Sequence, residues 1–151
     1  MYRKMLVPLD GSEHSECTLA HVQEVACAHQ VAEVILLTVS EPVRQPATAY
    51  LGTHEIEDVE KRSVASAREY LETTARGLNV PSAVRTDVVS GLPAEAILDY
   101  VEKNRVDLVV MSTHGRSGPS KWLIVSVAEK VIARSPAPVF LIPSPLCRAT
   151  L

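Results

Sequence analysis

Residues 106–126 read VDLVVMSTHGRSGPSKWLIVS and predict a strand, a loop and a helix in succession. An apolar run from Leu108 to Met111 is followed by a loop of small and polar residues, 112–118, and then by a periodic segment that begins near Ser120. Ligands of parallel α/β sheets bind outside the carboxyl ends of the strands, where backbone N–H groups and helix N-termini favour anions. The loop is therefore a candidate anion site, and the alternative is an ordinary connection made of turn residues.

The same alternation of strand and helix patterns runs through the rest of the chain. Continuous apolar runs predict strands, and apolar residues at helical spacing predict helices between them. This order predicts an α/β fold with a doubly wound, five-stranded parallel sheet, flanking helices, right-handed crossovers and a single domain. The expected strands are 4–9, 34–39, 83–89, 106–111 and 139–142, and the expected helices begin at Ser12, at about residue 54 (ending at Gly77), at Pro93 and near Ser120.

Composition and charge exclude several classes of protein. The formal net charge of −3 at pH 7 gives no electrostatic reason to expect a nucleic-acid partner. Acidic residues follow the short apolar run at the N-terminus, and no segment has the roughly 20 apolar residues of a membrane helix, so we expect a cytoplasmic protein without a membrane partner. The three cysteines lack metal-ligand spacing, so neither a disulfide framework nor a metal site is expected.

Asp10 is a second candidate for the site, because it follows the first predicted strand. This position puts Asp10 at the same edge of the sheet as the loop 112–118. Its carboxylate can accept hydrogen bonds from a ribose or an adenine amino group, or it can cap the following helix, which also has Ser12 as an expected N-cap. The segment 40–53 leaves the same edge and is either a lid over a ligand or a connection without a role.

The motifs of common catalytic and nucleotide-binding sites are absent from the sequence. There is no G-x-x-x-x-G-K-[ST] loop, no G-x-G-x-x-G after the first strand and no G-x-S-x-G nucleophile elbow. His114 is the only histidine near the expected site, and no Cys or Ser is arranged with it as a nucleophile and base. We therefore expect no catalytic residue.

Five stretches together resemble the universal stress protein family along nearly the whole chain. They are KMLVPLDGS (4–12), VILLTV (34–39), DLVVMSTHGRSG (107–118), SVAEKVI (126–132) and SPAPVFLI (135–142). The resemblance implies a family domain over residues 1–144, a tail over 145–151 and the strand order 3-2-1-4-5. It also implies a homodimer through the last strand (Val139, Phe140, Leu141 and Ile142) and, in one branch of the family, binding of an adenine nucleotide.

That nucleotide-binding branch carries the motif G-x-x-G, nine further residues and G-[ST], which this chain keeps only in part. Gly115 and Ser126 remain, whereas Ser112 and Val125 replace two of the glycines. The change at Ser112 is mild, because a hydroxyl can still donate to phosphate. Val125 is the serious change, because a β-branched side chain puts bulk where a backbone N–H would meet the anion.

The resemblance also implies roles for residues outside this motif. Asp10 matches the acid that faces the ribose, Val39 matches a backbone position that faces adenine, and Pro8 and Met111 match walls of the pocket. Mg or Mn would enter only through bound phosphates. The complete expected nucleotide site is Pro8, Asp10, Val39, Met111, Ser112, Gly115, Arg116, Gly118, Ser126 and Val127.

Three functions follow from these residues, in order of preference. The first is a stress-response module that binds ATP or AMP, weakly because the phosphate motif is degraded. The second is a dimeric stress protein that binds no nucleotide and acts through protein partners, which Val125 favours. The third is a slow ATPase, which is disfavoured because Asp10-Gly11-Ser12 lacks the paired glycines that wrap pyrophosphate in related folds.

Overall fold

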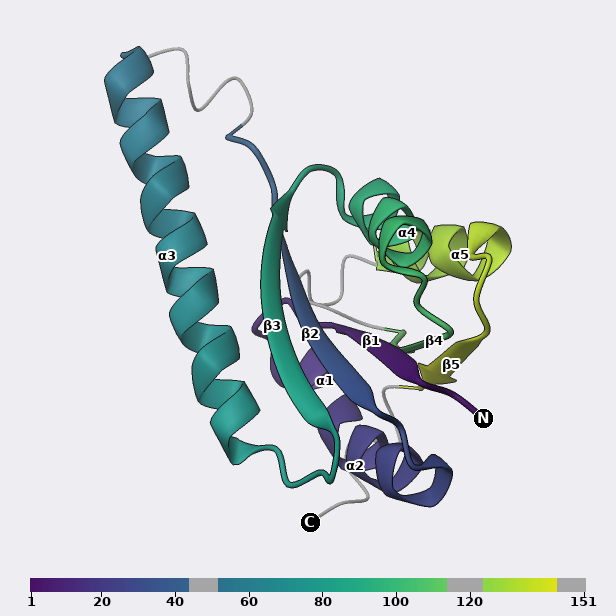
Figure 1. Ribbon diagram of the computed structural model, residues 1–151. Coiled ribbons are helices and arrows are strands. Elements are labelled where there is room, and N and C mark those ends of the chain that lie inside the picture. The colour runs from purple at the N-terminus through teal and green to yellow at the C-terminus, as the bar shows by residue number, and fades with distance from the viewer. Residues whose placement is uncertain (44–51, 114–123, 144–151) are drawn as a thin grey trace.

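Five parallel strands form one sheet in the order β3-β2-β1-β4-β5 (Figure 1), in a computed structural model that describes residues 1–43, 52–113 and 124–143. The elements alternate along the chain as predicted, and the strand order matches the one implied by the family resemblance. They are β1 (Lys4–Pro8), α1 (Glu13–Glu16), α2 (Thr18–His29), β2 (Glu33–Ser40), α3 (Thr53–Gly77), β3 (Ala83–Ser90), α4 (Pro93–Asn104), β4 (Leu108–Ser112), α5 (Ile124–Arg134) and β5 (Val139–Ile142).

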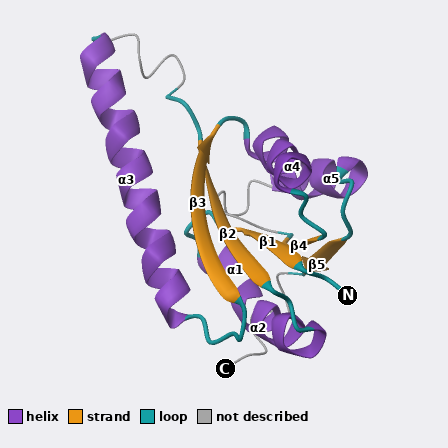
Figure 2. Ribbon diagram, in the orientation of Figure 1, coloured by secondary structure: helices purple, strands orange, loops and turns teal. Residues whose placement is uncertain are grey.

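Helices cover both faces of this single-domain sheet, and each face has its own hydrophobic core (Figure 2). On one face, Val22 of α2 and Leu71 of α3 are fully buried together with Leu36 of β2. On the other face, α4 and α5 pack against alternate strand residues such as Leu6 and Ile35. A strand that is buried on both faces reads as a continuous apolar run, which is why the VILLTV stretch predicted β2 correctly.

The amino ends of β1 and β4 are joined by the carboxylate of Asp107. Its two oxygens accept hydrogen bonds from the backbone N–H groups of Arg3 and Lys4, at 2.9 and 3.0 Å. The backbone N–H of Asp107 in turn donates to the carbonyl of Lys4 at 3.0 Å. These bonds fix the position of β1 relative to β4 at the amino edge of the sheet.

The first predicted helix is two helices in the structure, with a break at Cys17. Ser12 is the N-cap of α1, as expected, because its hydroxyl accepts from the backbone N–H of Ser15. The hydroxyl of Thr18 donates to the carbonyl of Ser15 at 2.6 Å. A side chain that bonds to a carbonyl of the preceding turn competes with the regular backbone bond and bends a helix, which accounts for the break.

Two cysteines lie in the described part of the chain. Cys17 is disulfide-bonded, so the expectation that the cysteines form no disulfide is wrong. Cys27, on α2, is a free and exposed thiol.

The helix predicted over residues 54–77 is α3, with 25 residues. It runs along the β3 side of the sheet, and its amino-terminal part extends beyond the strands (Figure 1). Its exposed surface is strongly charged, and no helix in the described ranges is long and apolar enough to cross a membrane. Most of the segment 40–53, expected as a lid or a plain connection, lies outside the described residues.

Candidate functional site

The carboxyl ends of three neighbouring strands bring five of the expected site residues to one edge of the sheet. Pro8 ends β1, Val39 is the last residue but one of β2, and Met111 and Ser112 end β4. Asp10 follows β1 by two residues. Because β1 lies between β2 and β4, Val39 lies on one side of the end of β1, and Met111 and Ser112 lie on the other.

Two hydrogen bonds hold the residue before Asp10 firmly to β2. The backbone N–H of Leu9 donates to the carbonyl of Leu37 at 2.8 Å. The hydroxyl of Thr38 donates to the carbonyl of Leu9 at 2.9 Å, and Thr38 is buried. The position of Asp10 relative to β2 is therefore set by the hydrogen bonds of its neighbour Leu9, before any ligand is considered.

The strand β2 extends past β1, which leaves Val39 beyond the paired part of the two strands. Their register ends with Pro8 opposite Leu37, whereas β2 continues to Ser40. Bonds from one strand to a given neighbour involve every second residue, and Leu37 bonds to the β1 side. The backbone groups of Val39, two residues further on, therefore face the turn that contains Asp10.

Asp10 begins a tight turn, and Ser12 of this turn hydrogen-bonds to the Asp10 carboxylate. Gly11 has a φ of 79°, a left-handed conformation that glycine adopts without strain. Oδ1 of Asp10 accepts one hydrogen bond from the backbone N–H of Ser12 at 3.0 Å and another from the Ser12 hydroxyl at 2.6 Å. The N-cap of α1 is Ser12 itself, so the carboxylate of Asp10 braces the cap residue rather than capping the helix directly.

The far side of the candidate site is formed by the end of β4. Met111 and Ser112 are both buried there, with 5% and 8% of their surfaces exposed. The backbone N–H of Thr113 donates to the carbonyl of Ile142 at 3.1 Å, so pairing with β5 continues beyond the end of β4. This places Ser112 at the rim of the sheet, where the chain enters the loop that was predicted to bind an anion.

Most of that loop lies outside the described residues, including Gly115, Arg116 and Gly118 as well as His114. The helix after it, α5, is described over Ile124–Arg134, and its expected start near Ser120 also lies outside the described residues. Ser126 lies in this helix. Val127 is half-buried and packs against the core on the α4 and α5 face.

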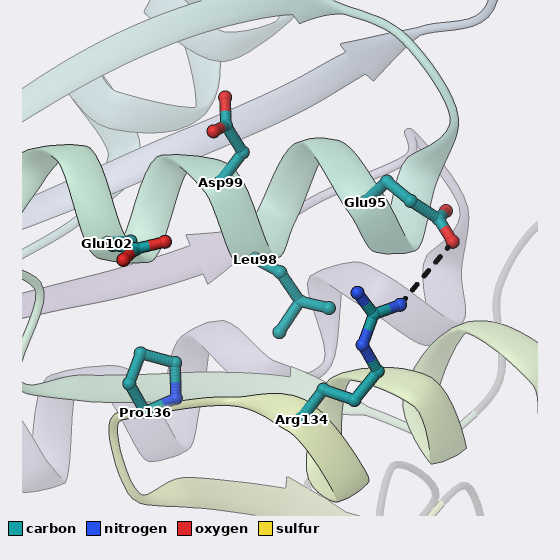
Figure 3. Close-up of a pocket in the computed structure, with 6 residues that line it drawn as sticks. All are labelled: Glu95, Leu98, Asp99, Glu102, Arg134 and Pro136. Atoms are coloured by element: carbon teal, nitrogen blue, oxygen red, sulfur yellow. Dashed lines mark ion pairs between the residues drawn. The ribbon is translucent and has the colours of Figure 1, made fainter.

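A separate hollow of about 260 Å³ lies between α4 and the end of α5 (Figure 3). Arg134 forms an ion pair with Glu95 there, at 3.7 Å. None of the residues expected to bind a nucleotide lines this hollow. Its lining is Glu95, Leu98, Asp99, Glu102, Arg134 and Pro136.

Two tyrosines outside the candidate site have raised pKa values. Burial and a hydrogen bond to Asp87 raise the pKa of Tyr100 to about 12. Burial and the neighbouring Glu16 raise the pKa of Tyr70 to about 12. Among the described residues, no group of three His, Cys, Asp or Glu side chains is placed to hold a metal ion.

The model of the Universal stress protein family matches residues 1–143 of this chain. Universal stress protein MJ0577 of Methanocaldococcus jannaschii is 31% identical over an alignment of 155 positions, which covers 94% of this chain and 95% of the relative. The solved structure of MJ0577 superposes with a TM-score of 0.80 at 30% identity, over 95% of this chain and 96% of that one.

Two more distant structures have the same fold and contain adenine nucleotides. A universal stress protein in complex with cAMP superposes with a TM-score of 0.66 at 21% identity, over 93% of this chain and 97% of that one. A family protein from Arabidopsis thaliana with AMP bound superposes with a TM-score of 0.62 at 16% identity, over 93% and 91% of the two chains.

Proposed function

Because the chain belongs to the universal stress protein family, we propose that it is a cytoplasmic stress-response module that binds an adenine nucleotide, ATP or AMP, at the carboxyl edge of its sheet. The observation that carries this proposal is the turn after β1. It presents a carboxylate held in place by Ser12, beside the overhanging end of β2 and the buried end of β4. Family members with bound cAMP and AMP support the class of ligand.

The adenosine half of the ligand is assigned to residues of β1 and β2. Asp10 accepts hydrogen bonds from the ribose hydroxyls, because a carboxylate is an acceptor-only group at neutral pH. The backbone of Val39 has both a donor and an acceptor for the edge of adenine, on the side where β1 has ended. Pro8 and Met111 supply apolar walls on either side.

The phosphates are assigned to the loop and helix that follow β4. Ser112 donates its hydroxyl at the start of the loop, and the chain continues through Gly115, Arg116 and Gly118 to Ser126 and Val127 in α5. Binding is weak, because Val125 replaces a glycine of the motif. Mg or Mn binds only through the phosphates. ATP hydrolysis is slow at most, because the turn Asp10-Gly11-Ser12 lacks the paired glycines that wrap pyrophosphate.

We propose in addition that two copies of the chain pair through β5, the outermost strand on its side of the sheet. Phe140 of β5 is 44% exposed, and Ile132 of α5 is 48% exposed. Exposed strand edges with apolar side chains favour pairing with another chain. The expected contact strand is Val139, Phe140, Leu141 and Ile142. The alternative function is that of a dimer that binds no nucleotide and acts through protein partners.

Calorimetric titration with ATP and with AMP in magnesium buffer, on protein checked for carried-over nucleotide by native mass spectrometry, tests the proposal. We expect binding by the wild-type protein and about 10- to 100-fold weaker binding by Asp10→Ala, because hydrogen bonds to a charged group contribute about 1.5–3 kcal/mol. Asp58→Ala removes an exposed carboxylate of α3 and is the matched control. An apo dimer that gives no heat with either nucleotide would favour the alternative that acts through protein partners.

A further inference from the structure

We propose that Leu92 is a further binding residue of the nucleotide site, where its side chain makes an apolar contact with the face of the adenine base. This inference rests on the proposed adenine nucleotide site and deepens it. Leu92 lies between β3 and α4, and it is not among the residues that the family resemblance implies.

Apolar residues reach the carboxyl edge of the sheet on the face that α4 and α5 cover. Val39 of β2 and Val89 of β3 are partners in the strand register, so they lie side by side. Both are half-buried and pack against the core on that face. The edge beside the backbone groups assigned to adenine is therefore apolar on the side of α4.

These strand residues leave little apolar surface for a flat base to rest on. Met111, an expected wall of the site, is only 5% exposed. Small-molecule sites are lined mainly by apolar side chains, with a few polar groups that fix orientation. Leu92, which is 45% exposed, supplies the apolar surface that is missing at this edge.

The turn that carries Leu92 is tied to the end of β2. Ser90 is the register partner of Ser40, and the backbone N–H of Gly91 donates to the carbonyl of Ser40 at 3.1 Å. Gly91 has a φ of 149°, which glycine adopts without strain. The turn then leads from the carboxyl edge to α4 (Figure 1). Because Ser40 directly follows Val39, these bonds bring Leu92 to the part of the edge that is assigned to adenine.

Leu92 is also the N-cap of α4, although leucine is poor at this position. Its carbonyl accepts the backbone N–H of Ala96 at 2.8 Å, and its side chain makes no cap hydrogen bond. Asn, Asp and Ser are strongly preferred at an N-cap, because their side chains accept a backbone N–H of the first turn. Natural proteins depart from such local preferences chiefly at functional sites. A contact with the base accounts for an exposed leucine at this position.

Substitution by asparagine separates binding from stability at this position. Leu92→Asn removes the apolar contact and supplies a good N-cap, so the protein should be at least as stable as wild type. We expect Leu92→Asn and Leu92→Ala to bind AMP and ATP about 3- to 10-fold more weakly. Leu92→Met keeps the apolar surface and should keep the wild-type affinity. Val59→Ala, which shortens a 43% exposed side chain of α3, is the matched control and should also bind as wild type.

Calorimetric titration gives the affinities, and ¹³C NMR of the leucine methyl groups detects the contact itself. The ring current of a base packed on Leu92 should shift its methyl signals upfield when AMP saturates the wild-type protein. Unchanged AMP affinity in both Leu92→Asn and Leu92→Ala would overturn the role of Leu92 while leaving nucleotide binding intact. Methyl signals of Leu92 that do not move at saturation would overturn it as well. A wild-type protein that binds neither ATP nor AMP would overturn the proposed function, and this inference would fall with it.

Discussion

The phenol of Tyr100 in α4 donates a 3.0 Å hydrogen bond to Oδ2 of Asp87 in the edge strand β3. Asp87 also accepts the guanidinium of Arg85 at 3.3 Å and the backbone N–H of Val88 at 3.0 Å. This single carboxylate therefore connects α4 to the outer strand of the sheet and occupies a backbone donor of that strand.

The raised pKa of Tyr100 predicts a loss of stability at alkaline pH. The pKa of Tyr100 is about 12 in the folded protein against 10.0 in the unfolded chain. Between these two pH values the phenol keeps its proton in the folded protein and loses it in the unfolded chain. The stabilisation is complete below pH 10 and is lost as the pH rises toward about 12. Urea denaturation of the wild-type protein and Tyr100→Phe between pH 9 and pH 12 checks this, and equal pH slopes for both proteins would contradict it.

Replacement of Asp87 should destabilise the protein and promote association. Asp87→Ala removes acceptors from Tyr100 and from the backbone N–H of Val88, and a buried donor without a partner costs about 1–3 kcal/mol. It also leaves β3 with an uncovered edge, which favours pairing between molecules. Thermal unfolding and light scattering measure the two effects. Asp99→Ala, which removes an exposed carboxylate of α4, is the control, and an equally small change in both variants would refute the prediction.

Glycine at the carboxyl end of α4 should stabilise the protein. Arg105 has a φ of 52°, and Val106 follows it with a backbone bond to the carbonyl of Val101 at 3.0 Å. Helices commonly end in this conformation with glycine, because a side chain there is strained. Arg105→Gly should raise the free energy of unfolding by about 0.5–1 kcal/mol. Arg105→Ala keeps the strain and should show no gain, so equal stability of the two variants would contradict the argument.

Substitution of Val125 tests why the nucleotide is expected to bind weakly. Val125→Gly restores a glycine of the family motif, at a position in α5 (Ile124–Arg134). We expect tighter ATP binding and little change for AMP, because the added space serves the outer phosphates. Calorimetry with both ligands gives the comparison, and Ala133→Gly, at an exposed position further along α5, controls for the cost of a helical glycine, about 1 kcal/mol. No gain in ATP affinity would show that bulk at position 125 does not limit binding.

The sequence predicted the strands and the sheet well, because strands that are buried on both faces consist almost entirely of apolar residues. The apolar runs around Leu36 and Val109 predicted central strands, because segments with helical spacing separate them along the chain. Helix ends were predicted less well. The hydrogen bond from Thr18 to Ser15 divides the first helix, and a pattern of apolar residues carries no sign of it.

The sequence predicted which residues of the candidate site reach one edge of the sheet, and it did not predict their contacts. Asp10 and Val39 reached the same edge because parallel strands all end there. The bracing of Asp10 by Ser12 depends on the left-handed turn at Gly11, and the sequence Asp-Gly-Ser was its only visible signal. Thr38 stands in an apolar run as one more β-branched residue, so the sequence carried no sign that its buried hydroxyl bonds to the carbonyl of Leu9.

A ¹⁵N NMR titration with AMP tests the location of the nucleotide most directly. We predict saturable shifts of the backbone amides of Gly11, Val39 and Ser112. The amides of Glu95 and Arg134, which line the separate hollow between α4 and α5, should stay in place. Shifts confined to that hollow, or no saturable shift anywhere, would contradict an adenine nucleotide site at the carboxyl edge of the sheet.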